Sequence, residues 1–182
     1  MNVTVFGGSQ PKPGGPAFEQ ALRFGKLLGA AGHTVLTGGY IGIMEAVSQG
    51  AASEGAHVIG VTCEDIEAWR KQGPNRWVAE ECRCATLPER IMQMINRCDA
   101  ACALPGGPGT LTEISLTWNL LLTDSIRPRP LILIGRGWEQ IFQSLFNHMG
   151  SYIPENQRKW LIFAPDVDTA ARLLATPAVA PY

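Results

Sequence analysis

Residues 100–122 read AACALPGGPGTLTEISLTWNLLL, and this stretch is the strongest indication of the fold. Residues 100–104 are a short apolar run that predicts a buried strand, and residues 111–122 predict a helix. The glycine-rich turn between them, residues 105–110, lets backbone N–H groups approach a ligand closely. The helix that follows presents its positive dipole end to an anion. The stretch therefore predicts a phosphate-binding turn in an α/β protein.

The same alternation of short apolar runs and helical patterns continues on both sides of this turn. Extended segments are expected at residues 3–6, 34–36, 57–61, 77–78, 83–86, 131–134 and 161–164. Helices are expected at residues 18–30, 43–54, 88–97, 138–149 and 167–175, the last with Asp166 as its N-cap. Continuous apolar strands separated by helices predict a doubly wound parallel sheet with helices on both faces. The 182 residues fit one domain, residues 1–182.

Residues 62–74 lack a regular pattern, apart from a short helix expected near residues 66–71. The segment is long for a connection in a compact domain. Long loops of this kind are often functional lids.

Composition excludes several classes of function. The net charge of −1 argues against a nucleic-acid-binding face, and no apolar run reaches the roughly 18 residues of a membrane span. The cysteine count of five is odd and no signal peptide precedes the first strand, which indicates the cytoplasm and reduced thiols. The spacings Cys82-x-Cys84 and Cys98-x-x-x-Cys102 do not match those of zinc ribbons, so no metal is predicted.

Three predicted strand ends carry glycine-rich turns, and ligands bind beyond these ends in a doubly wound sheet. The residues expected to contact a phosphorylated ligand are Gly8, Ser9, Gly38, Gly39, Gly42, Pro105, Gly106, Gly107, Gly109 and Thr110. None of the turns matches a G-x-G-x-x-G fingerprint or a Walker A motif, which favours a mononucleotide over a dinucleotide. The alternative is that the glycines only serve tight turns.

A longer pattern surrounds the turn of residues 105–110. The run Pro105-Gly106-Gly107-x-Gly109-Thr110-x-x-Glu113 resembles the P-G-G-x-G-T-x-x-E signature of the LOG (Lonely guy) family, long labelled lysine decarboxylase-like. Upstream, Glu89-Arg90 followed by Met94 is similar to the family's E-R-K-x-x-M helix. Gly38-Gly39 with Gly42-Ile43-Met44 is similar to its G-G-G-x-x-G-L-M turn. The resemblance extends over most of the chain to about residue 134.

This resemblance implies a Rossmann-like fold and a homodimer or larger assembly with active sites near the dimer interface. Characterised members of the family cleave the N-glycosidic bond of cytokinin nucleoside 5′-monophosphates or of AMP, and release the free base and ribose 5-phosphate. The family's catalytic pair corresponds to Arg90 and Glu113, and Met44 joins the expected substrate-binding residues. No cofactor is implied.

The chain departs from the family pattern at five positions. Ile91 replaces the lysine of E-R-K, and Tyr40 replaces the third glycine of G-G-G. Glu45 stands where a glycine is usual, Pro108 where tyrosine is common, and Gln10 replaces a serine of the first turn. The departures leave the phosphate turn and the Arg90/Glu113 pair intact.

The predicted pair suits the implied chemistry. Breaking the C1′–N bond of a nucleotide builds positive charge on the ribose, and a carboxylate at Glu113 can stabilise it and orient the attacking water. Arg90 offers a planar fork of donors for the ribose hydroxyls or the phosphate, and a charge that holds Glu113 ionised. Two alternatives remain open: Thr110-x-x-Glu113 also fits a capping box, and Arg90 also fits a solvated helix charge.

Two functions follow from these observations. The first is hydrolysis of a nucleoside 5′-monophosphate, and the alternative is a non-catalytic nucleotide-binding or sensing protein that uses the same pocket. Lysine decarboxylation needs a lysine that forms a Schiff base with pyridoxal phosphate. None of the four lysines lies in a recognisable cofactor setting. Both of the functions that remain involve a small-molecule nucleotide, which is the expected partner.

Overall fold

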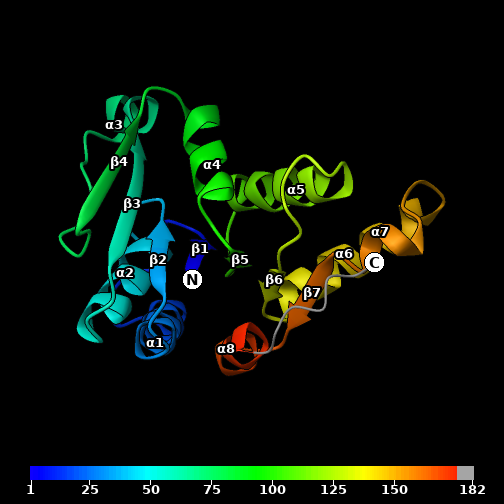
Figure 1. The fold of residues 1–182 in the computed structure, drawn as a ribbon, viewed down its shortest axis with the longest axis horizontal. Coiled ribbons are helices and arrows are strands. Elements are labelled where there is room, and N and C mark those ends of the chain that lie inside the picture. Colours follow the sequence, from blue (N-terminus) through cyan, green and yellow to red (C-terminus); the bar gives the residue numbers. More distant parts are fainter. Residues whose placement is uncertain (176–182) are drawn as a thin grey trace.

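The computed structural model describes residues 1–175 and contains a seven-stranded sheet (Figure 1). Its strands are β1 (Asn2–Phe6), β2 (Thr34–Thr37), β3 (Val58–Cys63), β4 (Glu80–Cys84), β5 (Ala100–Ala103), β6 (Leu131–Ile134) and β7 (Leu161–Ala164). They lie in the order β4-β3-β2-β1-β5-β6-β7, and each neighbouring pair is parallel. Because the chain begins in the middle, builds one half and then returns to build the other, the sheet is doubly wound, as predicted.

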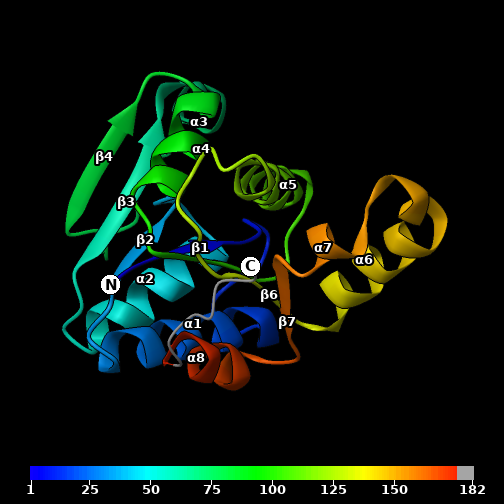
Figure 2. The same cartoon turned by 45° about the vertical axis from the view of Figure 1, so that its right-hand side comes forward.

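Helices cover both faces of the sheet. They are α1 (Pro16–Ala30), α2 (Ile43–Ser53), α3 (Glu64–Arg70), α4 (Leu87–Asn96), α5 (Pro108–Leu122), α6 (Arg136–Met149), α7 (Glu155–Arg158) and α8 (Val167–Ala175), with a 3-10 turn η1 (Gly150–Tyr152). Figure 2 shows α1, α2 and α8 on one face, and α4 and α5 on the other. The predicted α/β architecture is confirmed.

Alternation along each strand explains why both faces are covered. Val3 and Val5 of β1 belong to the core beneath α1, α2 and α8, whereas Phe6 belongs to the core beneath α4, α5 and α6. Strands with apolar side chains on both faces need helices on both faces to exclude water.

The start of α5 differs from the sequence prediction. The helix begins at Pro108 and its N-cap is Gly107, so Thr110 lies inside the first turn. The capping-box interpretation of Thr110 and Glu113 is therefore wrong, because Thr110 does not occupy the cap. The predicted N-cap at Asp166 is confirmed, since its Oδ1 accepts a hydrogen bond of 2.7 Å from the Thr169 N–H.

The expected loop of residues 62–74 is more ordered than predicted. β3 continues to Cys63, and α3 follows at once. The extended segment expected at residues 77–78 is wrong: Trp77 lies in a turn, where its N–H donates to Asn75 Oδ1. β4 begins at Glu80, after this turn and three residues before the extended segment expected at residues 83–86, and it ends at Cys84. Two elements, η1 and α7, had no sequence prediction.

Two further findings concern the residues that the structure describes. No helix within residues 1–175 combines the length and apolarity that crossing a membrane requires. All five cysteines are free thiols.

Candidate functional site

Three strand ends meet at the carboxyl edge of the sheet. The turn after β1 is tied to the turn after β5, since the Gly8 N–H donates to Pro105 O at 3.1 Å. It is also tied to the start of α2, since the Ile43 N–H donates to Gly8 O at 2.9 Å. The three glycine-rich turns predicted from the sequence are therefore brought together.

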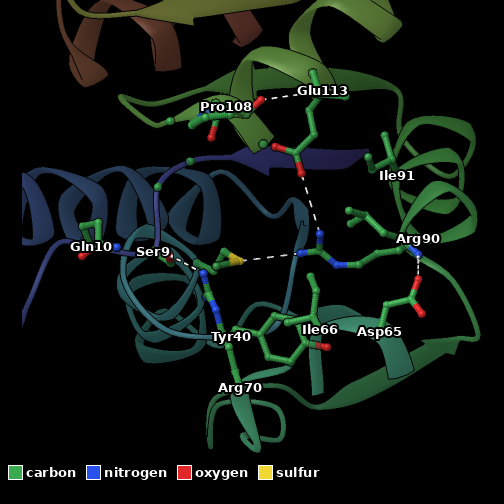
Figure 3. Close-up of a pocket in the computed structure, with 18 of the residues that line it drawn as sticks. Ser9, Gln10, Tyr40, Asp65, Ile66, Arg70, Arg90, Ile91, Pro108 and Glu113 are labelled. Atoms are coloured by element: carbon green, nitrogen blue, oxygen red, sulfur yellow. Dashed lines mark hydrogen bonds and ion pairs between the residues drawn. The ribbon is translucent and has the colours of Figure 1, made fainter. Parts of the chain in front are cut away.

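A cavity of about 600 Å³ opens beside these turns (Figure 3). Eight of the residues predicted for the site line it: Gly8, Ser9, Met44, Arg90, Gly107, Gly109, Thr110 and Glu113. Five others, Gly38, Gly39, Gly42, Pro105 and Gly106, do not line the cavity. The structure thus divides the predicted set into a lining layer and a supporting layer.

The supporting glycines leave room for functional side chains. A Cβ on Gly38 would overlap Nη2 of Arg90 and lie 2.6 Å from Sδ of Met44, so any larger residue would displace the guanidinium from its observed position. Gly42 has a φ of +77°, and a Cβ there would lie 2.6 Å from Gly8 O. These two positions show why the turn after β2 needs glycine.

Arg90 lies on α4, and its guanidinium is held by two backbone carbonyls. Its Nε donates to Val61 O at 2.7 Å, and its Nη2 donates to Gly38 O at 3.1 Å. The residue is only 5% exposed. The interpretation of Arg90 as a solvated helix charge is therefore wrong.

Glu113 lies on α5 and points toward Arg90 across the cavity (Figure 3). Its Oε1 is 3.9 Å from Nη1 of Arg90. Within residues 1–175 its carboxylate accepts no hydrogen bond, so this long ion pair is its main partner. Burial raises the pKa of the Glu113 carboxyl to about 7, and the charge of Arg90 opposes that rise. The carboxyl can therefore gain or lose a proton near neutral pH.

One wall of the cavity is contributed by α3, and none of its residues was predicted from the sequence. Asp65, Ile66, Trp69 and Arg70 all line the cavity. The Arg70 Nη2 donates to Ser9 Oγ at 3.0 Å, which closes α3 onto the turn after β1. The only signal in the sequence was the unusual length of the segment 62–74, which suggested a lid without naming a residue.

Four departures from the family pattern line the cavity, namely Gln10, Tyr40, Ile91 and Pro108, and two of them change its character near α3 and α4. Ile91, which replaces a lysine, lines the cavity together with Ile66 and Leu87. Tyr40, which replaces a glycine, is buried, and its ring centre lies 5.6 Å from the guanidinium carbon of Arg90. The wall near α3 and α4 is therefore more apolar than the family pattern implies.

Possible metal ligands are scattered. Among the residues that the structure describes, no group of three or more His, Cys, Asp or Glu side chains has an arrangement suited to a metal ion. The chemistry available in the cavity is that of two carboxylates, Asp65 and Glu113, two guanidinium groups, hydroxyls and backbone N–H groups.

Comparison with known proteins identifies relatives of the chain. Residues 44–174 match the family model described as "Possible lysine decarboxylase". A probable cytokinin riboside 5′-monophosphate phosphoribohydrolase of Oryza sativa subsp. japonica is 30% identical over 178 residues, which cover 94% of this chain and 76% of the relative. The LOG cytokinin riboside 5′-monophosphate phosphoribohydrolase of the same plant is 34% identical over 153 residues, covering 81% of this chain and 61% of the relative.

A solved structure resembles the chain over nearly its whole length. The molybdenum cofactor binding protein from Rippkaea orientalis superposes with a TM-score of 0.74 and covers 96% of this chain and 94% of its own. Its sequence identity is 23%, so this likeness concerns the fold.

Proposed function

The chain belongs to the LOG family, and from this premise we propose that it hydrolyses the N-glycosidic bond of a nucleoside 5′-monophosphate, with AMP or a cytokinin-type nucleotide as substrate. The observation that carries the proposal is the buried Arg90–Glu113 pair, which faces a 600 Å³ cavity beside the phosphate turn. The products are the free base and ribose 5-phosphate.

The phosphate is assigned to the first turn of α5. Gly107 and Gly109 line the cavity, and a Cβ at either would meet no atom of the protein within 4 Å. The backbone there is open to a ligand, and the unpaired N–H groups and the dipole of a 15-residue helix favour an anion. Glu113 follows on the next turn of α5, so a phosphate at this position brings the ribose toward its carboxylate.

The reaction needs a group that stabilises positive charge at C1′. As the C1′–N bond breaks, its electron pair goes to the base and the ribose becomes oxocarbenium-like. The ionised Glu113 stabilises that charge and orients water, whose oxygen forms the new bond to C1′. One proton of the water passes to the carboxylate, which is suited to this role by a pKa of about 7. A proton from solvent completes the departing base, and Glu113 returns its proton to solvent, so the carboxylate is restored. Arg90 keeps Glu113 ionised and faces the same cavity.

Release of free base tests the proposal directly. AMP, GMP, CMP and prenylated AMP are incubated with the protein, and the free base is separated by chromatography. We expect release from at least one of them, and we expect Glu113→Gln to lower turnover by about 10²–10³-fold while the nucleotide still binds. Near wild-type turnover in Glu113→Gln, or an unchanged rate and affinity in Arg90→Ala, would remove the catalytic roles assigned here.

A non-catalytic nucleotide-binding or sensing role is the second candidate. Ile91 favours it, because an apolar side chain lines the cavity where the family carries a lysine. Micromolar binding of monophosphates without release of base from any of them would support this role over hydrolysis. The decarboxylation in the family's description is not proposed, because no lysine among residues 1–175 lines the cavity.

A second copy of the chain is the proposed protein partner. Apolar side chains of α5 and α6 flank a groove of about 480 Å³, and Leu111, Ile141 and Leu145 are 42%, 52% and 36% exposed. Such a face is costly to leave in water. The family resemblance implies a homodimer, and light scattering should give the mass of two chains. Ile141→Glu should give the mass of one, and a monomeric wild type would exclude the proposal.

A further inference from the structure

The end of β3 runs past its neighbour β2 at the carboxyl edge of the sheet. β2 pairs with β3 only as far as Thr37 and Gly60, whereas β3 continues to Cys63 alongside β4. Beyond Gly60, the backbone groups of β3 on the β2 side need other partners, because a buried unpaired polar group costs about 1–3 kcal/mol.

Two side chains supply those partners. Arg90 Nε donates to Val61 O, as described above. The Tyr40 hydroxyl takes the next position: it accepts from the Cys63 N–H at 2.8 Å and donates to Cys63 O at 3.1 Å. Burial raises the pKa of this hydroxyl, so it keeps the proton that it donates. Tyr40 therefore replaces a missing strand neighbour at Cys63.

The two acceptors of Arg90 belong to the two segments that Tyr40 joins. Val61 O is on β3, and Gly38 O is at the end of β2, where the turn containing Tyr40 begins. The hydroxyl of Tyr40 crosses the same gap, and its ring lies beside the guanidinium (Figure 3). The hydrogen bonds between Tyr40 and Cys63 therefore help to set the distance between Val61 O and Gly38 O. Because these two oxygens hold Arg90, that distance also sets the direction of Nη1 toward Glu113.

We infer that Tyr40 is a positioning residue for Arg90, and that its hydroxyl sets how strongly Arg90 holds Glu113 ionised. A glycine, which the family carries here, has no side chain with which to make the bridge. The inference rests on the proposed function for its effect on turnover, but its effect on the Glu113 carboxyl is independent of turnover. Other titratable or charged side chains lie near these three residues. Asp65 and Arg70 line the same cavity as Arg90 and Glu113, and Cys63 and Glu67 lie near the Tyr40 hydroxyl.

The test follows the Glu113 carboxyl by ¹³C NMR in protein labelled at glutamate side chains, with Glu113→Gln identifying the signal. In the wild type the carboxyl should titrate near pH 7. In Tyr40→Phe, which loses only the hydroxyl, the pKa should rise by about half a unit or more because Arg90 is held less well. Tyr40→Leu, which also loses the ring, should give a larger rise.

Thr4→Val is the matched control. Thr4 is also fully buried, and its hydroxyl donates to Met94 O on the helix that carries Arg90, away from the gap at β3. All three substitutions should lower the melting temperature, but only the two at Tyr40 should move the Glu113 titration. In an active enzyme Tyr40→Phe should lower kcat about tenfold with KM changed less than about twofold.

The outcomes separate the two claims. If Tyr40→Phe and Tyr40→Leu titrate Glu113 as the wild type does and only the melting temperature falls, Tyr40 has a purely structural role and the inference is overturned. If no substrate is hydrolysed but the titration moves as expected, the proposed function fails and the positioning role of Tyr40 is supported.

Discussion

Nη1 of Arg90 lies 3.9 Å from Oε1 of Glu113 although both side chains are buried. The distance is too long for a hydrogen bond, so the attraction between them is one of charge alone. Nε and Nη2 of Arg90 donate hydrogen bonds to backbone carbonyls, and Nη1 is left directed at Glu113. The arginine is thus fixed by the protein, while the carboxylate keeps its lone pairs available for water or ribose.

The first prediction concerns the pH dependence of hydrolysis. The proposed mechanism uses ionised Glu113, whose pKa is raised to about 7 by burial. Base release, measured as kcat/KM, should therefore fall as the pH drops below about 7, approaching a tenfold loss per pH unit. A rate that stays level down to pH 5 would mean that ionised Glu113 is not required.

The second prediction concerns the free energy of unfolding. The Glu113 carboxyl titrates near 4.5 in an ordinary setting and about 7 in the folded protein. Between these values the folded state binds more protons than the unfolded state, so stability falls as the pH rises through this window. Above pH 7 the full cost of burying the carboxylate is present.

Glu113→Gln removes that cost. The variant should be more stable than the wild type at pH 8, and its advantage should shrink as the pH approaches 4.5, as measured by urea unfolding. Glu139→Gln changes an exposed glutamate on α6 and should follow the wild type at every pH. A constant difference between Glu113→Gln and the wild type across this range would contradict the raised pKa.

Much of the fold and the centre of the site could be predicted because local pattern and tertiary role coincide there. The turn of residues 105–110 follows a buried strand and opens a helix, and in a parallel sheet this order fixes the edge at which it lies. The start of α5 was misplaced although a signal existed: proline is favoured at the first helical position, which Pro108 occupies.

The remainder of the site depends on strand register, which no local pattern encodes. Val61 O is free to accept from Arg90 only because the pairing of β2 with β3 ends at Gly60, one residue before Val61. Likewise, Tyr40 could be noticed as a departure from a motif, but its bond to Cys63 joins elements 23 residues apart. α3 escaped full prediction because seven residues, none of them buried, carry too little hydrophobic periodicity.

The third prediction compares two glycines in equivalent helix positions. Gly109 is the second residue of α5 and Gly137 is the second residue of α6, and a Cβ at either meets no protein atom within 4 Å. Alanine at either position should leave the melting temperature unchanged or slightly higher. Only Gly109 lines the cavity, so only Gly109→Ala should weaken binding of ribose 5-phosphate, by about tenfold in calorimetry. Equal binding of ribose 5-phosphate by both variants would contradict the assignment of the phosphate to the first turn of α5.

The fourth prediction assigns Arg70 to phosphate recognition. Within residues 1–175 its guanidinium has no carboxylate partner and donates only to the neutral Ser9 hydroxyl, beside the turns where the phosphate is proposed to bind. A charged donor with a neutral partner gains more from a phosphate oxygen than it loses by leaving a hydroxyl. Arg70 should therefore discriminate nucleotides from nucleosides.

Arg70→Ala should raise KM for the monophosphate about tenfold, because a hydrogen bond to a charged group contributes about 1.5–3 kcal/mol. The same variant should leave the weak binding of the corresponding nucleoside unchanged, since the nucleoside has no phosphate to lose. Lys71→Ala removes the same charge from the next residue, which is exposed and outside the cavity lining, and should change KM less than about twofold. If both variants raise KM equally, the effect is general electrostatic attraction, and Arg70 makes no specific contact with the phosphate.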